Sequence, residues 1–173
     1  MKKIVTGILL ILSINVFSYE ALPTPNHVDV ARYAGKWYAV STLPQFFTSS
    51  CIAQIAEYAV INDTTISVLN TCIKKYCNPT NIQGQAVVVD KKTNARLEVT
   101  FDNFFTKLFR VKGEYVIIKL SEGYDTALVG STNRKSLWIL SRTQNVEPSV
   151  LQDYKKTAKD LGFSIENLVD SKW

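Results

Sequence analysis

The sequence predicts an all-β fold: an eight-stranded up-and-down antiparallel β-barrel with one C-terminal α-helix packed outside. Three observations predict it: eight short apolar or alternating stretches, turn-forming residues between them, and a change to helical periodicity near the end. The stretches cover residues 37–43, 52–61, 66–73, 82–89, 96–101, 114–120, 126–131 and 136–141. Closing such a meander into a barrel removes its unpaired strand edges, and eight strands leave room for one small ligand.

The links between the stretches contain residues that favour turns for backbone reasons. They hold Pro44, Asn62-Asp63, Asn78-Pro79, residues 91–94, Asp102-Asn103, Gly123 and Asn133-Arg134. Links of a meander alternate between the two ends of the barrel. The first, third, fifth and seventh links, at residues 44–50, 74–81, 102–111 and 133–135, are therefore expected at one end.

A helical period replaces the alternation over residues 147–161. Its apolar face consists of Leu151, Tyr154, Ala158 and Leu161. Pro148 lies near the start and Gly162 just past the end, as helix termini favour. This face is expected to pack on the outside of the barrel, and residues 165–169 are a candidate for a ninth, edge strand.

Residues 1–18 have the pattern of a signal peptide. Lys2 and Lys3 precede an apolar run at residues 4–12, and small or acceptable residues follow it at Val16 and Ser18. The run is shorter than the ~20 residues that span a bilayer, although a retained anchor helix is the alternative. No cysteine follows the run, so the expected product is one soluble domain, residues 19–173, in the periplasm or secreted and not lipid-anchored.

Composition and charge argue against several function classes. Removing Lys2 and Lys3 leaves 18 basic and 15 acidic residues, a net charge of +3, which is too weak to indicate nucleic-acid binding. The chain has one histidine, His27, no G-x-S-x-G, no phosphate loop and no metal-ligand cluster, so no enzyme, metal or cofactor is expected.

Three local motifs resemble the lipocalin family, in particular the bacterial lipocalins and the apolipoprotein D-like group. Gly35-Lys36-Trp37 is similar to the G-x-W signature of the first strand, and residues 138–143 are similar to the last-strand motif that ends in Arg142. Tyr124 matches a family turn in which Gly123 replaces the usual Asp. The resemblance implies that Gly35, Trp37, Tyr124 and Arg142 are structural, with Arg142 stacked on Trp37 at the closed end of a calyx.

The resemblance also implies a function, the binding and possibly the transport or storage of a small hydrophobic ligand in the cell envelope. A fatty acid or a lysophospholipid is favoured. A protein-interaction module that uses the barrel mouth is the alternative, and a lipocalin-fold enzyme is a remote one. The protein is expected to be a monomer or a weak dimer.

The candidate ligand-binding residues lie on strands and in mouth links. They are Tyr58, Trp138, Tyr115, Phe101, Phe47 and Phe105. Tyr58 matches a wall tyrosine of the family, but alternation does not fix which face of a strand points inward.

The first and fifth links contain six large apolar residues, an unusual composition for turns. They are Phe46, Phe47, Phe104, Phe105, Leu108 and Phe109. A lid over the ligand, shallow membrane docking and packing onto the barrel rim are the three interpretations.

The three cysteines, Cys51, Cys72 and Cys77, leave one thiol unpaired if a disulfide forms. With a two-residue hairpin at Asn62-Asp63, Cys51 faces Lys74, and Cys72 lies one diagonal step away. A longer turn would bring Cys51 towards Cys77. The family resemblance favours Cys51–Cys72, while a Cys72–Cys77 loop or no bond remain open.

Overall fold

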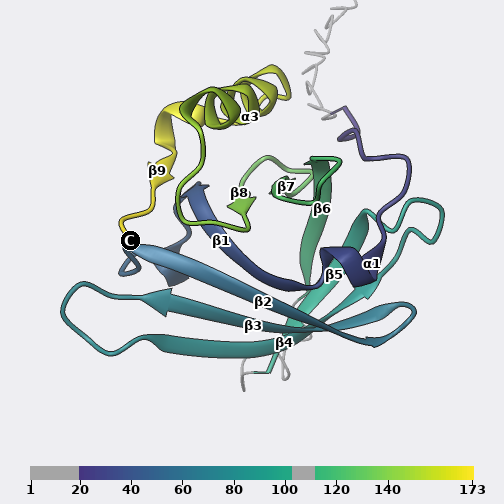
Figure 1. The fold of residues 1–173 in the computed structure, drawn as a ribbon, viewed down its shortest axis with the longest axis horizontal. Coiled ribbons are helices and arrows are strands. Elements are labelled where there is room, and N and C mark those ends of the chain that lie inside the picture. The colour runs from purple at the N-terminus through teal and green to yellow at the C-terminus, as the bar shows by residue number, and fades with distance from the viewer. Residues whose placement is uncertain (1–19, 103–111) are drawn as a thin grey trace, which may run out of the picture.

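The computed structural model describes residues 20–102 and 112–173, and within them eight antiparallel strands form a closed barrel (Figure 1). The strands are β1 (Gly35–Thr42), β2 (Ala53–Asn62), β3 (Thr65–Ile73), β4 (Thr80–Val88), β5 (Arg96–Phe101), β6 (Gly113–Leu120), β7 (Thr126–Gly130) and β8 (Leu137–Ser141). Each strand pairs with the next, and β1 pairs with both β8 and β2, which closes the sheet. The predicted fold class is therefore confirmed. The expected signal peptide lies outside the described residues.

The two ends of the barrel are built differently. At one end the short helix α1 (Val30–Tyr33) precedes β1, and at the opposite end lies the β3–β4 link (Figure 1). Asp29 caps α1 by accepting hydrogen bonds from the backbone N–H groups of Ala31 and Arg32. The backbone N–H of Val28 donates to the carbonyl of Thr93 in the β4–β5 link at 2.7 Å, so the segment before α1 covers this end as a floor.

The hairpin between β2 and β3 differs from the expected one. Its two loop residues are Asp63 and Thr64, not Asn62 and Asp63, because Asn62 pairs with Thr65. The Oδ1 atom of Asn62 accepts from the Thr64 N–H at 3.1 Å, and the register shifts between Val60 and Asn62.

This register determines where the cysteines lie. Cys72 is opposite Gln54, and Cys51 precedes β2 instead of opening it, so the expected pairing of Cys51 with Lys74 is wrong. The chain just before β2 brings the two Cα atoms to 5.2 Å, and a disulfide joins Cys51 to Cys72. Cys77 is exposed and free.

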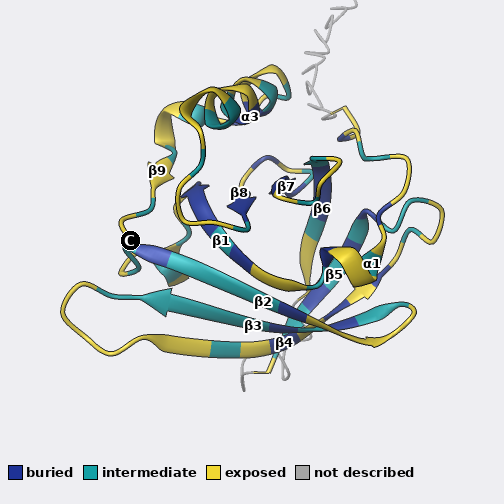
Figure 2. Cartoon of the chain, in the orientation of Figure 1, coloured by how far each residue is buried: buried dark blue, intermediate teal, exposed yellow. Residues whose placement is uncertain are grey.

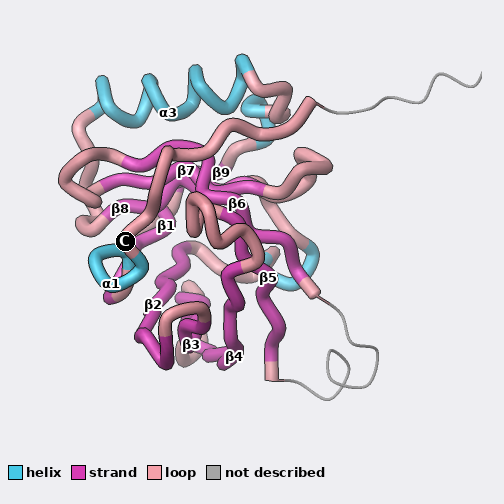
Figure 3. Tube along the Cα trace, turned by 90° about the vertical axis from the view of Figure 1, so that its right-hand side faces the viewer, coloured by secondary structure: helices cyan, strands magenta, loops and turns pink. Residues whose placement is uncertain are grey.

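The predicted helix is α3 (Pro148–Asp160), which lies along one side of the barrel (Figure 3). Tyr154 and Ala158 are buried against an outer core that includes Leu128 and Ile139, while Leu151 and Leu161 pack at its margin. Figure 2 shows the mainly buried strands β7 and β8 and the buried part of β6 beneath the helix. The Tyr154 hydroxyl donates to the Thr126 carbonyl at 3.0 Å, which fixes the helix on the barrel.

The tail after α3 is only partly as expected. Residues Ile165–Asn167 form a 3₁₀ turn, η2, and the strand β9 is confined to Val169–Asp170. It pairs with Ser41 and Thr42 of β1. Because β2 pairs with β1 only from Gly35 to Ala39, the edge of β1 at Ser41 and Thr42 is available to pair with the tail. Within residues 20–102 and 112–173, no helix is long and apolar enough to cross a membrane.

Candidate functional site

The candidate site is the inner wall of the barrel. Its core contains Trp37 and Ala39 of β1 together with inward side chains of the other strands, namely Tyr58, Ile66, Val68, Ala86, Val88, Leu97, Val99, Ile117, Ala127, Val129 and Leu140. Residues at the floor are fully buried, whereas Phe101, Tyr115 and Trp138 pack against the same core but stay partly exposed. The wall is thus sealed at the floor and less covered towards the other end.

Alternation along the strands identifies the inward positions. Counting in steps of two from the core members, with allowance for the bulges, gives no Asp, Glu, Lys or Arg at an inward position of the described strand residues. The interior is therefore apolar with a few neutral polar groups. A neutral interior suits a ligand that is mainly hydrocarbon.

The floor is an indole plug held by a guanidinium. Trp37 is fully buried, and its Nε1–H donates to the Tyr33 carbonyl at 2.8 Å. The Cζ atom of Arg142 lies 3.8 Å from the centroid of the Trp37 ring. The same guanidinium donates to the carbonyls of Arg32, Tyr33, Ala34, Lys36 and Tyr124 at 2.8–3.2 Å. Burial lowers the pKa of Arg142.

Gly35 is required by this floor for two reasons. Its φ of +98° lies in the left-handed region that side chains disfavour, and a Cβ there would be 3.2 Å from Nη1 of Arg142. The glycine of the G-x-W motif therefore allows the Arg142 guanidinium to lie close to the backbone at the start of β1.

The β6–β7 turn is intact although Gly123 replaces the usual Asp. The Oγ atom of Ser121 accepts from the backbone N–H groups of Asp125 and Thr126 at 2.8 and 3.0 Å. Tyr124 adopts a φ of +62°, and its hydroxyl accepts from the Asp29 N–H at 2.9 Å. Ser121 thus supplies hydrogen bonds that the turn requires.

A cluster of three tyrosine hydroxyls lies deep in the barrel. The Tyr115 hydroxyl is 2.7 Å from that of Tyr33 and 3.1 Å from that of Tyr58. Burial raises the pKa of Tyr58 to about 12, and burial with the neighbouring phenols raises the pKa of Tyr33 and Tyr115 well above the ordinary value. The three phenols are therefore neutral at physiological pH, and because two of their three protons serve the hydrogen bonds between them, one O–H can donate to a ligand oxygen.

Asn70 carries an unpartnered polar atom on the inner wall. It alternates with Ile66 and Val68, which belong to the interior core, and pairs with Ala56 and Ile82 on the neighbouring strands. Its Oδ1 atom is buried and has no hydrogen-bond partner. An unpartnered buried acceptor is unfavourable in the free protein, and a ligand with a hydroxyl or amine would satisfy it.

The first mouth link brings the candidate Phe47 to the surface. The 3₁₀ helix η1 (Phe46–Thr48) presents Phe46 at 91% and Phe47 at 61% exposure. Packing of these two rings onto the rim, one of the three interpretations, is therefore wrong, because the turn projects them outward. Phe105 and the other apolar residues of the fifth link lie outside the described residues.

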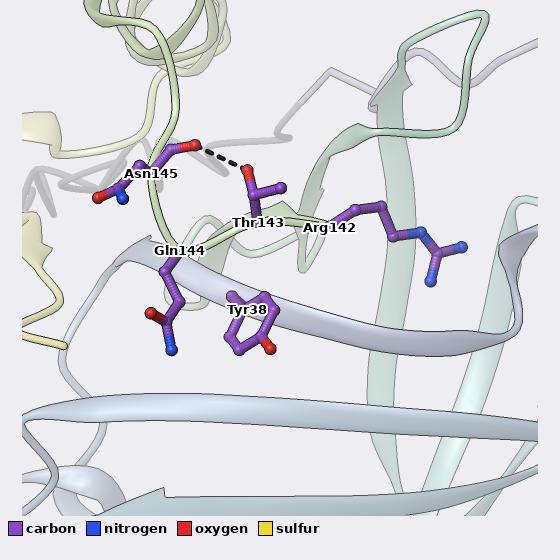
Figure 4. A pocket seen from close by; sticks show the side chains of 5 residues that line it. All are labelled: Tyr38, Arg142, Thr143, Gln144 and Asn145. Atoms are coloured by element: carbon purple, nitrogen blue, oxygen red, sulfur yellow. Dashed lines mark hydrogen bonds between the residues drawn. The ribbon is translucent and has the colours of Figure 1, made fainter.

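The hollow shown in Figure 4 lies elsewhere. It is an open depression of about 560 Å³ lined by Tyr38, Arg142 and residues 143–145. Tyr38 belongs to the outer core beside α3, and the Arg142 guanidinium points away from the hollow into its carbonyl contacts (Figure 4). The hollow is shallow and polar, so it does not compete with the barrel interior as a site for an apolar ligand.

The structure brings four candidates to the inner wall and adds two that the sequence did not single out. Tyr58, Tyr115, Trp138 and Phe101 share the interior core. Tyr33 and Asn70 are the additions. Tyr33 lies in the short turn directly before the G-x-W motif, which could have drawn attention to it, whereas nothing in the sequence distinguishes Asn70. In the described part of the chain, no three His, Cys, Asp or Glu side chains form a metal-binding group.

Comparisons with known proteins agree with this geometry. Residues 28–172 match the family model described as a lipocalin-like domain. The outer membrane lipoprotein Blc of Vibrio cholerae is 33% identical over 87% of this chain and 85% of its own length. Apolipoprotein D of Oryctolagus cuniculus is 25% identical over 94% of this chain and 87% of its own. The structure of insecticyanin from the tobacco hornworm Manduca sexta superposes with a TM-score of 0.68 at 17% identity, covering 89% of this chain and 85% of that one, which is a likeness of fold.

Proposed function

The chain belongs to the lipocalin family, and from this premise we propose that it binds a single-chain lipid, a fatty acid or a lysophospholipid, inside its barrel and carries or stores it in the cell envelope. The matches bear out the resemblance to the bacterial lipocalins and apolipoprotein D that the motifs carry. Lipocalins generally bind or carry small hydrophobic molecules, and we propose that this one has no catalytic activity.

The observation that carries the proposal is the neutral inner wall. Phe101, Tyr115 and Trp138 offer partly exposed aromatic surface above a sealed floor, with no charged side chain at the described inward positions. Burial of ten methylenes at ~0.8 kcal/mol each offers about 8 kcal/mol before ordering costs. Micromolar affinity requires about 8 kcal/mol net, so the further methylenes of a longer acyl chain are needed to offset the ordering costs.

The same wall favours one orientation of the ligand. A phosphate or carboxylate buried there would lack a cationic partner, and burial of an unpaired charge is strongly unfavourable. Lys74 and Lys75 begin the β3–β4 link at the mouth. We therefore place the acyl chain towards the tyrosine cluster and the charged headgroup at the mouth.

The location is also part of the proposal. The Blc relatives are named outer membrane lipoproteins, a name that is in tension with the expectation of no lipid anchor. We propose a soluble periplasmic or secreted form, since no cysteine stands among residues 1–50 and Cys51 is paired with Cys72. Intact mass of the protein from its own host tests this, because an acylated amino terminus would be heavier by the lipid.

Titration with oleic acid and with a lysophosphatidylglycerol, followed by tryptophan fluorescence, tests ligand binding. Trp138 lies on the inner wall, so Trp138→Phe is expected to abolish most of the saturable signal. Trp173→Phe is the matched control, since Trp173 lies outside, edge-on to Tyr38 and 41% exposed, and should keep the signal. No saturable response of the wild-type protein to either lipid would refute the proposal.

Native mass spectrometry of the purified protein provides a second readout. A co-purified lipid of single-chain mass supports the proposal. A bound protein with an interior free of lipid would instead support the protein-interaction module.

A further inference from the structure

We propose that the mouth end of the barrel docks on the surface of an anionic phospholipid bilayer. The docking surface, here called the mouth surface, consists of Phe46 and Phe47 in the β1–β2 link and Lys74, Lys75 and Tyr76 in the β3–β4 link. This goes beyond ligand binding in the interior, because it concerns what the outside of the mouth contacts.

The aromatic rings of the mouth surface are unusually exposed. Phe46 is 91%, Phe47 61% and Tyr76 84% exposed, the three largest values among the exposed large apolar side chains of the described residues. The Phe46 and Phe47 rings meet edge to face at 5.2 Å, so they form a paired apolar projection. Exposed apolar groups clustered at one place mark contact sites.

The two links are held in place, so the rings are presented by an ordered support. The Nε2 atom of Gln45 donates to the carbonyl of Lys135 in the β7–β8 link at 2.9 Å, and the Thr48 N–H donates to the Gln45 carbonyl at 3.0 Å. The disulfide between Cys51 and Cys72 ties the end of the first link to the end of β3, where the second link begins. An ordered support reduces the entropy that docking must overcome.

Charge favours an anionic membrane as the partner. Three of the four mouth links, at residues 43–52, 74–79 and 131–136, contain Lys74, Lys75, Arg134 and Lys135 and no Asp or Glu. Arg134 is buried, which leaves the three lysines to face a partner. The described residues of the fourth link, Asp102 and Lys112, add one charge of each sign. The links at the floor end, residues 62–65, 89–95 and 121–125, contain Asp63, Asp90, Glu122 and Asp125 against Lys91 and Lys92.

The chemistry of the mouth surface matches a bilayer interface in detail. Aromatic side chains settle at the headgroup level, and lysines next to them reach anionic phosphates while their stems stay with the apolar layer. The Nζ atom of Lys75 lies 4.9 Å from the centroid of the Tyr76 ring, so one cation and one aromatic ring already share a position. A protein partner for this surface would need an apolar groove for the rings and acidic side chains for the lysines.

Co-sedimentation with vesicles tests the proposal. The full chain without its first eighteen residues is incubated with vesicles of phosphatidylcholine alone or mixed with phosphatidylglycerol. Binding is expected to the mixed vesicles and to fall as salt is raised. Lys74→Gln with Lys75→Gln is expected to weaken it about tenfold or more. Phe46→Ser with Phe47→Ser is expected to weaken binding to the mixed vesicles as well, although it leaves the charge unchanged.

Val60→Ser with Ile61→Ser is the matched control, because these residues are 47% and 53% exposed at the floor end. The control should bind like wild type. Equal losses in the mouth and floor variants, or no sedimentation of the wild-type protein with mixed vesicles, would overturn the proposal. The oleic acid titration of the wild-type protein tests interior binding separately, so failure of either idea is distinguishable from failure of the other.

Discussion

Replacement of Trp37 by alanine should destabilise the protein far more than it weakens ligand binding per folded molecule. Trp37 is fully buried, donates to the Tyr33 carbonyl and lies 3.8 Å under the Arg142 guanidinium. It closes the floor of the barrel, whereas the candidate ligand wall at Trp138 and Phe101 lies above it.

The expected loss follows from these contacts. Truncation of a buried aromatic residue to alanine costs roughly 3–5 kcal/mol. The lost Nε1–H···O bond is worth about 1 kcal/mol, and the lost cation–π contact roughly 0.5–2 kcal/mol, both partly contained in that figure. The Tyr33 carbonyl keeps its bond from Arg142, so no acceptor is orphaned. We expect a loss of about 4 kcal/mol, which lowers Tm by roughly 10 °C for a chain of this size.

Urea unfolding followed by far-ultraviolet circular dichroism measures this loss. Oleic acid is then titrated at a temperature where the variant is folded. Trp173→Ala serves as the control and should cost about 1 kcal/mol, the size of its edge-to-face contact with Tyr38. A Trp37→Ala protein that unfolds like wild type but no longer binds would place Trp37 in the ligand wall and refute the floor assignment.

Three further outcomes are expected. Burial raises the pKa of Tyr58 to about 12, whereas an unfolded tyrosine titrates near pH ~10. The neutral phenol therefore contributes about 2–3 kcal/mol to the free energy of unfolding below pH ~10, and this contribution is lost as the pH rises through 12. Tyr58→Phe should therefore lose less stability between about pH 8 and 12 in urea unfolding, and an identical loss would contradict this assignment. Asn70→Leu should raise the free energy of unfolding by about 1 kcal/mol. It should also weaken the binding of a lysophospholipid more than that of a fatty acid, because only the lysophospholipid offers a hydroxyl to Oδ1. Paired titrations in which both affinities change equally would contradict this role of Asn70. Cys51→Ser with Cys72→Ser should cost about 3 kcal/mol, as a loop of 21 residues is no longer closed, and a reductant should lower the urea midpoint of the wild type but not of the variant.

Local patterns along the chain determined much of the fold. Alternation, turn residues and the helical period of residues 147–161 are short-range properties, and they yielded eight strands and α3. The motifs at Trp37 and Arg142 supplied the floor by resemblance, and their stacking is present in the structure.

The strand boundaries that were predicted wrongly depend on pairing between residues far apart in the sequence. The β2–β3 register is set by a bulge near Asn62 and by pairing along the whole ladder, so the partner of Cys72 could not be read from the loop sequence. The tail strand was confined to Val169–Asp170 because β2 leaves only a short edge of β1 unpaired.

What the sequence by itself determined is therefore the class of fold, the order of its elements and the two motifs of the floor. Only the tertiary structure decided which faces point inward, since alternation specifies two faces and barrel closure selects one. Closure gathers the hydroxyls of Tyr33, Tyr58 and Tyr115, residues up to 82 positions apart, and leaves Oδ1 of Asn70 without a partner. The projection of Phe46 and Phe47 from the mouth was likewise decided by how the links are anchored, because hydrophobicity alone is equally compatible with packing onto the rim.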